Sequence, residues 1–335
     1  MKTATRLEPF ITDYVSLHQA LGKGFDGEQY ILSALNRWLT QIGADDLTAE
    51  TFTTWCQTKQ HLASGVRRRH MAIVRNFCLY RRRRDAHCFV PDPLLFPALH
   101  QSRPPYIFSQ ADICRLIQVA GRLIQVAGEL DPTPASPLRA QVYRLAIVLL
   151  YTTGLRRGEL VRLTLGDYAS QERTLLVRQS KFHKSRYVPL SNDTVGEMNV
   201  YLDLRCQHQL PMAPETPLMW NRYHRRKAYT GAGLGQGLRH LFRLADIRSP
   251  DGRLPRVHDL RHSFAVHALW RWYQTGVDVR SKLPLLATYM GHVSIHSTEY
   301  YLPFIEVLAS EASERFAAHY SALITPWAER EGETS

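Results

Sequence analysis

Several hallmarks of common protein classes are missing from this chain of 335 residues. No apolar run approaches the roughly 20 residues that span a bilayer, and the opening Met1-Lys-Thr-Ala-Thr-Arg6 lacks the apolar segment of a secretory signal. The cysteines number five and include no Cys-x-x-Cys pair. This argues against a disulfide framework and against a cysteine zinc site. We therefore expect a cytoplasmic protein with reduced thiols, no signal peptide and no membrane partner.

Acidic residues are scarce relative to basic ones. Lys and Arg number 42 against 30 Asp and Glu, which gives a formal net charge of +12. Such a balance favours a polyanionic partner, either nucleic acid or an acidic membrane surface, and does not by itself choose between them. The length predicts two domains, because a single core rarely serves more than about 250–300 residues.

The N-terminal third shows only helical periodicity in its apolar residues. Gly22 and Gly43 are expected to end two helices, and Asp26 to open a capping box. A third helix is expected after Thr48. We predict an all-helical, DNA-binding domain over residues 1–104.

A basic cluster marks the fourth expected helix of this domain, Val66 to Tyr80. Eight arginines and no acid lie between Val66 and Arg84. A charge run usually means a solvated helix face, but like charges repel along one helix and a phosphate backbone relieves that repulsion. We therefore predict DNA contacts here. The predicted contact residues are Arg67, Arg68, Arg69, Arg75, Arg81, Arg82, Arg83 and Arg84.

A proline-rich stretch separates this domain from the rest of the chain. Five prolines fall between Phe89 and Ser109 without a helical period, which is typical of a linker. Helix signals resume at Ser109, and the segment 115–121 is then repeated without change as 122–128. Because seven residues are almost two helical turns, the apolar stripe should keep its face through the repeat.

The second domain, predicted over 105–327, is expected to be mainly helical with one small hairpin. Ser136-Pro137 has the composition of a helix start. Thr174–Val177 and Arg186–Leu190 read as two strands joined by a turn. An amphipathic helix should follow Tyr301, and residues 328–335 form a polar tail.

The glycine-rich segment 231–237 invites comparison with a phosphate-binding loop. Gln236 stands where that motif needs glycine, and no strand precedes the segment. We therefore predict a flexible turn before a helix that starts at Leu238.

A short segment near the C-terminus gathers candidate phosphate ligands. His258 and Arg261 lie three residues apart, so on a helix they share a face and can hold one anion together. The string from His258 to His262 also imitates the zinc motif His-Glu-x-x-His, but Asp259 replaces the glutamate and Arg261 would place a cation beside the metal. We predict neither a metal nor a cofactor.

The ordered set of motifs resembles the tyrosine recombinases, also called the phage integrase family. The motifs are Thr153-Gly-Leu-Arg156-x-x-Glu159-Leu, a lysine turn before Val188-Pro-Leu190, His258-x-x-Arg261, Gly291-His292 and Tyr301. Each motif alone is weak, and the ordered set is specific. The resemblance covers about residues 105–325, and the preceding domain is similar to the family's helical, SAM-like core-binding domain. It implies six catalytic residues, which are Arg156, Lys181, His258, Arg261, His292 and the nucleophile Tyr301.

Two of these positions have a competing neighbour. Distance from Val188-Pro-Leu190 favours Lys181 over Lys184, which we assign to DNA contact. Spacing from His292 favours Tyr301 over Tyr300. Adjacent helical residues point about 100° apart, so only one of these tyrosines can face the phosphate.

The resemblance implies a mainly α recombinase of a mobile element that cleaves double-stranded DNA through a 3′-phosphotyrosyl bond. Tyrosine, with a usual pKa of about 10, needs a base or a cationic surround to attack near neutrality. A homo-tetramer on two DNA sites, at the bacterial nucleoid, is implied, with accessory DNA-bending or directionality proteins as further candidate partners. The alternatives are a nicking and closing enzyme like the type IB topoisomerases and a DNA-binding protein with a disabled site.

Overall fold

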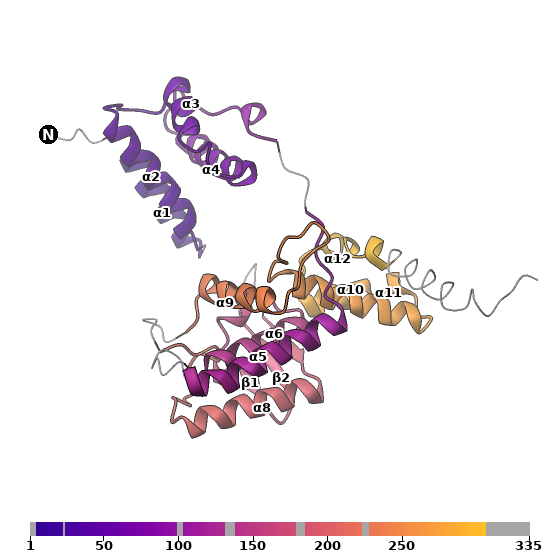
Figure 1. Cartoon of the computed structure of the whole chain (residues 1–335). Helices are drawn as coiled ribbons and strands as arrows, with labels where there is room; N and C mark the ends of the chain where they lie inside the picture. Colours follow the sequence, from indigo (N-terminus) through magenta and orange to yellow (C-terminus); the bar gives the residue numbers. More distant parts are fainter. Residues whose placement is uncertain are drawn as a thin grey trace, which may run out of the picture. The chain divides into compact units, whose positions relative to one another are not determined.

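Figure 1 shows a computed structural model of the chain, which describes residues 5–22, 24–98, 103–130, 138–178, 185–222 and 228–305. The chain divides into two compact units, Met1–Arg103 and Pro104–Ser335. Each unit has a hydrophobic core of its own. None of the described helices is long and apolar enough to cross a bilayer. The prediction of a mainly helical protein is confirmed.

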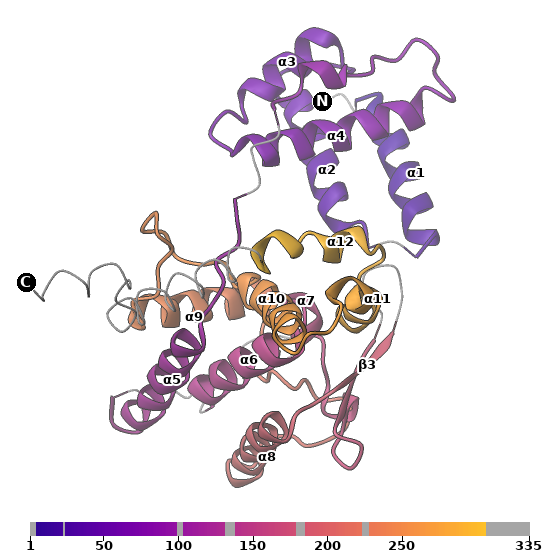
Figure 2. The ribbon, with the colours of Figure 1, turned by 90° about the vertical axis from the view of Figure 1, so that its right-hand side faces the viewer.

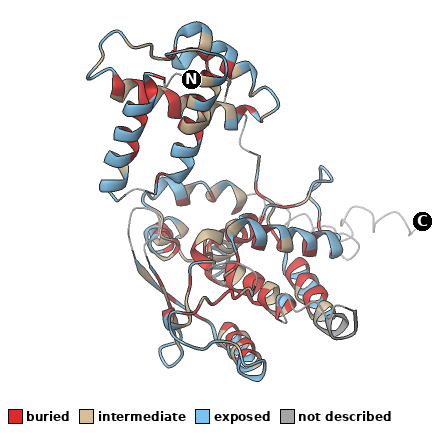
Figure 3. Cartoon of the chain, turned by 90° about the vertical axis from the view of Figure 1, so that its left-hand side faces the viewer, coloured by how far each residue is buried: buried red, intermediate tan, exposed pale blue. Residues whose placement is uncertain are grey.

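The described part of the first unit is built from helices around one apolar core. They are α1 (Leu7–Ala20), α2 (Asp26–Gln41), α3 (Ala49–Gln57) and α4 (Ser64–Arg81), followed by the 3-10 turn η1 (Pro93–Leu95). Leu32 and Leu35 of α2, Trp55 of α3 and Val74 and Phe77 of α4 are enclosed in this core. Figure 3 shows the buried positions recurring along the helices, as expected from their apolar periodicity.

In the first unit, the predicted glycine ends of two helices are confirmed, whereas the predicted capping box at Asp26 is absent. Thr48 and Thr51 form a capping box at the start of α3, with reciprocal hydrogen bonds of 3.2 and 2.8 Å. Gly22 and Gly43 adopt φ values of +70° and +71° after α1 and α2, a conformation that favours glycine. The capping box at Asp26 is absent, because α2 begins at Asp26 itself without a side-chain cap. The negative charge of Asp26 instead lies in the first turn, where it interacts favourably with the positive end of the helix dipole.

The second unit is helical apart from one small sheet. Its described α-helices are α5 (Gln110–Leu130), α6 (Arg139–Thr153), α7 (Arg157–Leu160), α8 (Asn192–Gln207), α9 (Gly231–Leu244), α10 (Asp259–Gln274), α11 (Val279–Met290) and α12 (His296–Glu299), with a 3-10 turn η2 (Leu165–Asp167). Helix α6 is central, because it packs against α5, α8 and α10 and buries most of its side chains (Figure 2).

The predicted hairpin is confirmed, and a third strand extends it. Strands β2 (Thr174–Val177) and β3 (Arg186–Pro189) pair antiparallel, with buried Leu175 opposite buried Val188. The short strand β1 (Tyr168–Ala169) pairs with the other edge of β2. The hairpin thereby places Arg186 at the start of β3, where it reaches the site described below.

Several predictions fall outside the described residues. These are the lysine turn with Lys181 and Lys184, the helix start at Ser136-Pro137, most of the helix expected after Tyr301, and the polar tail 328–335.

Helix α5 contains the exact repeat, 115–121 and 122–128, as one continuous helix. In the first copy, Leu116, Val119 and Ala120 are buried in the core of the second unit. Leu123, the counterpart of Leu116 in the second copy, packs against the same core. The second copy keeps its apolar residues on the same face of the helix because seven residues are close to two full turns.

The prediction of a flexible turn at residues 231–237 was wrong. These residues form the first turns of α9, and the hydroxyl of Thr230 caps the helix by accepting a hydrogen bond of 3.0 Å from the amide of Gly233. The intrinsic cost of glycine in a helix is therefore outweighed here by the cap and by tertiary packing.

Close packing explains why glycine is used in α9. A Cβ atom on Gly235 would lie 2.6 Å from the guanidinium of Arg157 on α7. One on Gly237 would lie 2.2 Å from the ring of Tyr143 on α6. The glycines thus let α9 approach α6 and α7 without steric overlap, which sequence patterning alone does not reveal.

Replacing Gly237 by alanine is predicted to destabilise the second unit by about 1–3 kcal/mol, because the new methyl group overlaps the Tyr143 ring. The control is Gly196→Ala on the exposed side of α8, where a Cβ meets no atom within 4 Å. That substitution should stabilise the helix by about 0.5–1 kcal/mol. Urea unfolding of both variants measures the difference. Wild-type stability of Gly237→Ala would contradict the packing described for α9.

Candidate active site

A buried carboxylate organises one side of the site. Glu159 of α7 is 3% exposed and accepts hydrogen bonds from the backbone N–H and the guanidinium of Arg156, at 2.9 and 2.7 Å. It also accepts two from the guanidinium of Arg186, at 3.3 and 2.9 Å. Burial alone would raise the pKa of Glu159, but the hydrogen bonds from Arg186 and Arg156 outweigh it and lower that pKa to about 2. Glu159 is thus ionised at neutral pH and ties Arg156 to strand β3.

The C-terminal end of α11 is held by guanidinium groups. Its last carbonyls have no partners within the helix, so they are natural acceptors for cationic donors. The pairs are Arg186 with Tyr289, Arg261 with Met290, and Arg156 with Gly291, at 2.8, 2.8 and 3.0 Å. Gly291 has a φ of +67° and ends α11, and the amide of His292 then donates to the carbonyl of Ala287 at 2.8 Å. The Gly291-His292 turn is therefore fixed against the arginines.

Arg261 projects from α10 into the interior of the site and is 1% exposed. Its guanidinium also donates to the carbonyl of Gly154, at the end of α6. Burial and the nearby Arg156 lower the pKa of Arg261 to about 9, which leaves it cationic at neutral pH. Arg261 thus adds a third guanidinium group near Glu159, whose carboxylate accepts hydrogen bonds from Arg156 and Arg186. A buried excess of positive charge is costly, so a bound anion would be stabilised here.

Three histidines border this cluster and are neutral at pH 7. Burial, followed by neighbouring positive groups, lowers the pKa of His258, His262 and His292 to about 4 in each case. The rings of His258 and His262 meet edge to face, with 4.7 Å between centroids. The Nδ1 atom of His292 lies 2.7 Å from the hydroxyl of Thr298, which orients that ring.

The two adjacent tyrosines have different surroundings. Tyr301 is 2% exposed, whereas Tyr300 is 41% exposed. The Tyr301 hydroxyl lies 3.0 Å from Nδ1 of His262, and its ring stacks on His292 with 6.4 Å between centroids. Burial raises the pKa of Tyr301 to about 12, and Arg261 acts in the opposite direction. Tyr301 is thus the tyrosine that faces the cations and histidines.

The structure brings together the described members of the predicted catalytic set. These are Arg156, His258, Arg261, His292 and Tyr301. Lys181 lies outside the described residues.

His262 is a site residue that sequence reasoning considered only as a zinc ligand. Its spacing of four residues from His258 places both on one face of α10, and this was the signal that could have found it. Among the described residues, no three His, Cys, Asp or Glu side chains gather where they could hold a metal ion.

Arg81, one of the predicted DNA contacts, has internal partners that argue against that role. Arg81 is 4% exposed and donates to carboxylate oxygens of Asp46 and Asp85, each at 2.7 Å. Hydrogen bonding to Asp46 raises its pKa further above the usual range. Asp46, which is remote in the sequence, and Asp85, four residues after Arg81, thus neutralise this cation, and it holds the first unit together.

The other arginines of the basic cluster fall into two groups. One group has partners within the first unit: Arg68 with the carbonyl of Pro97, Arg75 with that of Pro91, Arg69 with Glu28 and Arg84 with Asp13, at 2.9, 3.0, 3.4 and 2.6 Å. The pairs of Arg69 and Arg84 lie at the surface, where such contacts contribute little to stability. Arg82 and Arg83 are exposed, and Arg67 is half-buried.

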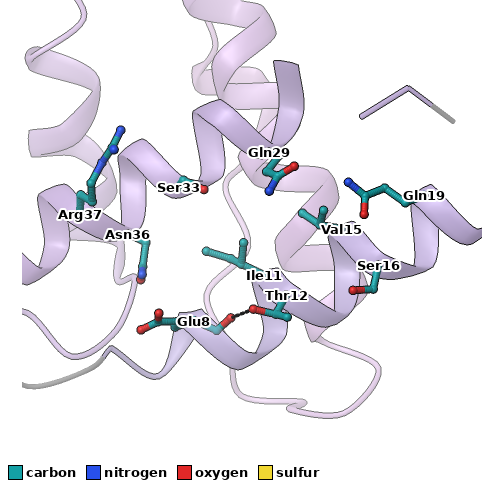
Figure 4. A pocket seen from close by; sticks show the side chains of 10 residues that line it. All are labelled: Glu8, Ile11, Thr12, Val15, Ser16, Gln19, Gln29, Ser33, Asn36 and Arg37. Atoms are coloured by element: carbon teal, nitrogen blue, oxygen red, sulfur yellow. Dashed lines mark hydrogen bonds between the residues drawn. The ribbon is translucent and has the colours of Figure 1, made fainter. Parts of the chain in front are cut away.

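A hollow in the first unit lies between α1 and α2 (Figure 4). Its lining is mostly polar and includes Glu8, Gln19, Gln29 and Arg37. None of the predicted catalytic or DNA-contact residues lines it.

The second unit is predicted to lose stability as the pH falls from about 6.5 towards 4. The pKa of His258, His262 and His292 is lower in the folded chain, about 4, than the ordinary value of 6.5, so the unfolded chain binds protons first. Stability present above pH 6.5 is then lost as the pH falls through that window, by up to about 3 kcal/mol for each of the half-buried His262 and His292, and by less for the exposed His258, whose charge solvent screens. Urea unfolding at a series of pH values measures this. A His292→Gln variant should show a shallower decline, and an unchanged decline would contradict the assignment.

Comparison with known proteins identifies the family of the chain. The profile of the phage integrase family matches residues 122–304, more than half of the chain. The putative integrase/recombinase y4rE of Sinorhizobium fredii is 31% identical over 302 residues, covering 90% of this chain and 93% of that protein. The tyrosine recombinase XerD of Brucella abortus is 27% identical over 319 residues, covering 91% and 94%.

Solved structures share the fold. The XerH recombinase in a post-cleavage complex with a palindromic difH substrate superposes with a TM-score of 0.60 at 17% identity, covering 87% of this chain and 79% of that one. A lambda integrase dimer, residues 75–356, bound to a COC′ core site has a TM-score of 0.58 at 15% identity, covering 88% and 94%. The family profile spans the segment from Arg156 to Tyr301 in which the cations, histidines and tyrosine converge. The chain belongs to the phage integrase family, as its ordered motifs predicted.

Proposed function

We propose that this chain is a site-specific recombinase that cleaves and rejoins double-stranded DNA through a 3′-phosphotyrosyl bond to Tyr301. The observation that carries the proposal is the place of the Tyr301 hydroxyl, among neutral histidines and near the buried Arg261 and the half-buried Arg156. Such a surround favours both the incoming phosphodiester and the negative charge that develops during attack.

The reaction needs a nucleophile, stabilisation of the phosphoryl oxygens and a proton for the leaving oxygen. The Tyr301 oxygen bonds to phosphorus as the bond from phosphorus to O5′ breaks. Arg156 and Arg261 bind the non-bridging oxygens, where a guanidinium can donate two hydrogen bonds at once. Lys181 supplies the proton to O5′. The neutral rings of His258 and His292 hydrogen-bond the phosphate or assist proton transfer.

Rejoining follows from the same chemistry in reverse. A free 5′ hydroxyl attacks the phosphotyrosyl bond and releases Tyr301. The number of phosphoester bonds does not change, so the reaction needs no ATP. Side chains provide the positive charge that metal ions provide in other phosphoryl transfers, and we propose no cofactor.

DNA contacts are proposed from both parts of the chain. Residues 1–104 form the core-binding domain, in which Arg67, Arg82 and Arg83 are the candidates least occupied by internal contacts. Residues 105–327 form the catalytic domain, and Lys184 contributes a further backbone contact. The net charge of +12 supports such a partner.

The biological setting is part of the proposal. Relatives include a putative integrase/recombinase, and a similar fold occurs in a transposon integrase bound to DNA, with a TM-score of 0.58. We propose recombination of a mobile element at the nucleoid by a homo-tetramer on two DNA sites. Accessory DNA-bending or directionality proteins are proposed partners. A nicking and closing enzyme is the second candidate, and a tetramer on DNA would exclude it.

Replacing Tyr301 by phenylalanine is predicted to abolish covalent attachment to DNA. The probe is a library of nicked duplexes with randomised sequence, since loss of the short fragment at the nick traps the intermediate. Wild type and Tyr300→Phe should form adducts that survive denaturation, and Tyr301→Phe should react at least about 10³-fold more slowly. Adducts from Tyr301→Phe but not from Tyr300→Phe would reverse the assignment. No adduct from wild type on any duplex would leave only the non-enzymatic, DNA-binding alternative.

Arg82→Ala and Arg83→Ala are predicted to weaken binding to a random-sequence duplex. They should also reduce the salt dependence of binding. The slope of the logarithm of the binding constant against the logarithm of the salt concentration should become shallower by about 0.9 for each phosphate that the variant no longer neutralises. Unfolding of the first unit should be unchanged by either. Arg81→Ala is the matched contrast. It should lower the free energy of unfolding of the first unit by about 2–4 kcal/mol, because Asp46 and Asp85 lose their shared buried cation. Arg81→Ala with wild-type stability and weakened DNA binding would contradict the division between structural and DNA-contacting arginines.

A further inference from the structure

The hydroxyl of Tyr301 is paired with a histidine to which none of the family motifs gives a role. Nδ1 of His262 lies 3.0 Å from the Tyr301 hydroxyl oxygen. The centroids of the two rings are 5.6 Å apart, and the ring planes meet at 56°. His292 stacks on the face of the same tyrosine, but its Nδ1 is engaged with the hydroxyl of Thr298. Of the three site histidines, His262 is therefore the one whose described contact reaches the reacting oxygen.

We propose that His262 is a catalytic residue that accepts the hydrogen bond of the Tyr301 hydroxyl and takes its proton as the oxygen attacks phosphorus. The inference rests on the proposed function. The proton of Tyr301 moves to Nδ1 of His262 while the bond from its oxygen to phosphorus forms. The bond from phosphorus to O5′ breaks, and O5′ takes a proton from Lys181. Rejoining returns the first proton to the tyrosine and the second to the lysine.

The surroundings of His262 suit an acceptor. The titratable or charged groups that face it are His258 and Arg261 of its own helix segment, Arg256 from the preceding loop, and Tyr300 and Tyr301 from the chain after α12. Burial, with Arg256 and Arg261, lowers the pKa of His262, so the ring is neutral at pH 7, and in its Nε2–H tautomer Nδ1 offers a lone pair to the Tyr301 hydroxyl. A phosphate bound at Arg261 offsets part of that positive charge and makes the ring a better base.

The timing of the transfer follows from the tyrosine. Burial raises the pKa of Tyr301 to about 12, so the hydroxyl keeps its proton in the resting site. Its acidity rises only as the oxygen begins to bond to phosphorus. An acceptor already in hydrogen-bond contact can then take the proton without further rearrangement.

A first test needs no DNA. If Tyr301 donates to Nδ1, neutral His262 must carry its hydrogen on Nε2, and nitrogen-15 NMR of the full chain distinguishes the two tautomers. We expect the Nε2–H form at pH 7, with the Nδ1 resonance displaced by Tyr301→Phe. An Nδ1–H tautomer would overturn the inference.

The kinetic test uses His262→Ala and His262→Asn with a matched control. His267 lies on the same helix and makes the same kind of contact, with Nδ1 2.9 Å from the hydroxyl of Tyr151. On a nicked duplex that wild type attacks, His262→Ala should lower the single-turnover rate by about 10²–10⁴-fold. His262→Asn keeps an acceptor near Nδ1 that cannot be protonated, so it should not restore the rate, whereas His267→Ala should react as wild type does. Full rescue by asparagine would reduce His262 to a positioning role and overturn the proton transfer.

A second substrate separates the two proton transfers. Replacing the bridging O5′ by sulfur gives a leaving group that needs no proton. The His262→Ala defect should persist on this duplex if His262 acts on the tyrosine. Disappearance of the defect would place His262 at the leaving group and overturn the inference. Failure of wild type to attack either duplex would instead contradict the proposed function, so the two failures are distinguishable.

Discussion

The sharing of one buried carboxylate by two guanidinium groups is the interaction on which the rest of the site depends. Glu159 receives hydrogen bonds from Arg156 beside it and from Arg186, 27 residues away on β3. Without this anion, Arg156 and Arg186 would lie together in a partly buried space with Arg261 and no counter-charge. Such an arrangement would cost several kcal/mol. The carboxylate therefore permits a concentration of positive charge that a phosphate can then use.

The same arginines also set the position of the distant half of the site. Arg156 reaches the carbonyl of Gly291, 135 residues later in the chain, and Arg261 reaches that of Met290. These contacts fix the end of α11, from which His292 and then Tyr301 follow. Positive charge and nucleophile are thus positioned by one network. The site combines a cationic interior with neutral histidines because burial beside arginine disfavours the protonated ring.

Much of the fold and of the candidate site could be predicted from the sequence, because those features depend on the spacing of residues close together in the chain. The segments Thr174–Val177 and Arg186–Leu190 indicated two strands joined by a turn, and the spacing of His258 and Arg261 indicated one helix face. Resemblance in the order of the motifs selected Tyr301 over Tyr300, and the geometry separates the two in the same way. Lys181 stays a prediction, because it lies outside the described residues.

What could not be predicted depends on contacts between segments remote in sequence. Arg81 looked like its neighbours until Asp46 appeared beside it. The glycines of α9 looked like a turn because the residues that limit their size are remote: Arg157 lies 78 residues before Gly235, and Tyr143 lies 94 residues before Gly237. His262 directly follows the motif His258-x-x-Arg261, whose function was assigned to His258 and Arg261 alone. In each case the deciding partner was supplied by the tertiary fold.

The central claim is that the Tyr301 oxygen, positioned by this charge network, becomes covalently joined to DNA. Mass spectrometry of a protease digest of the trapped adduct tests it most directly, because fragmentation between two adjacent tyrosines locates the attached nucleotide. We predict the phosphonucleotide on Tyr301. Attachment to Tyr300, or to any residue outside the site, would contradict the claim.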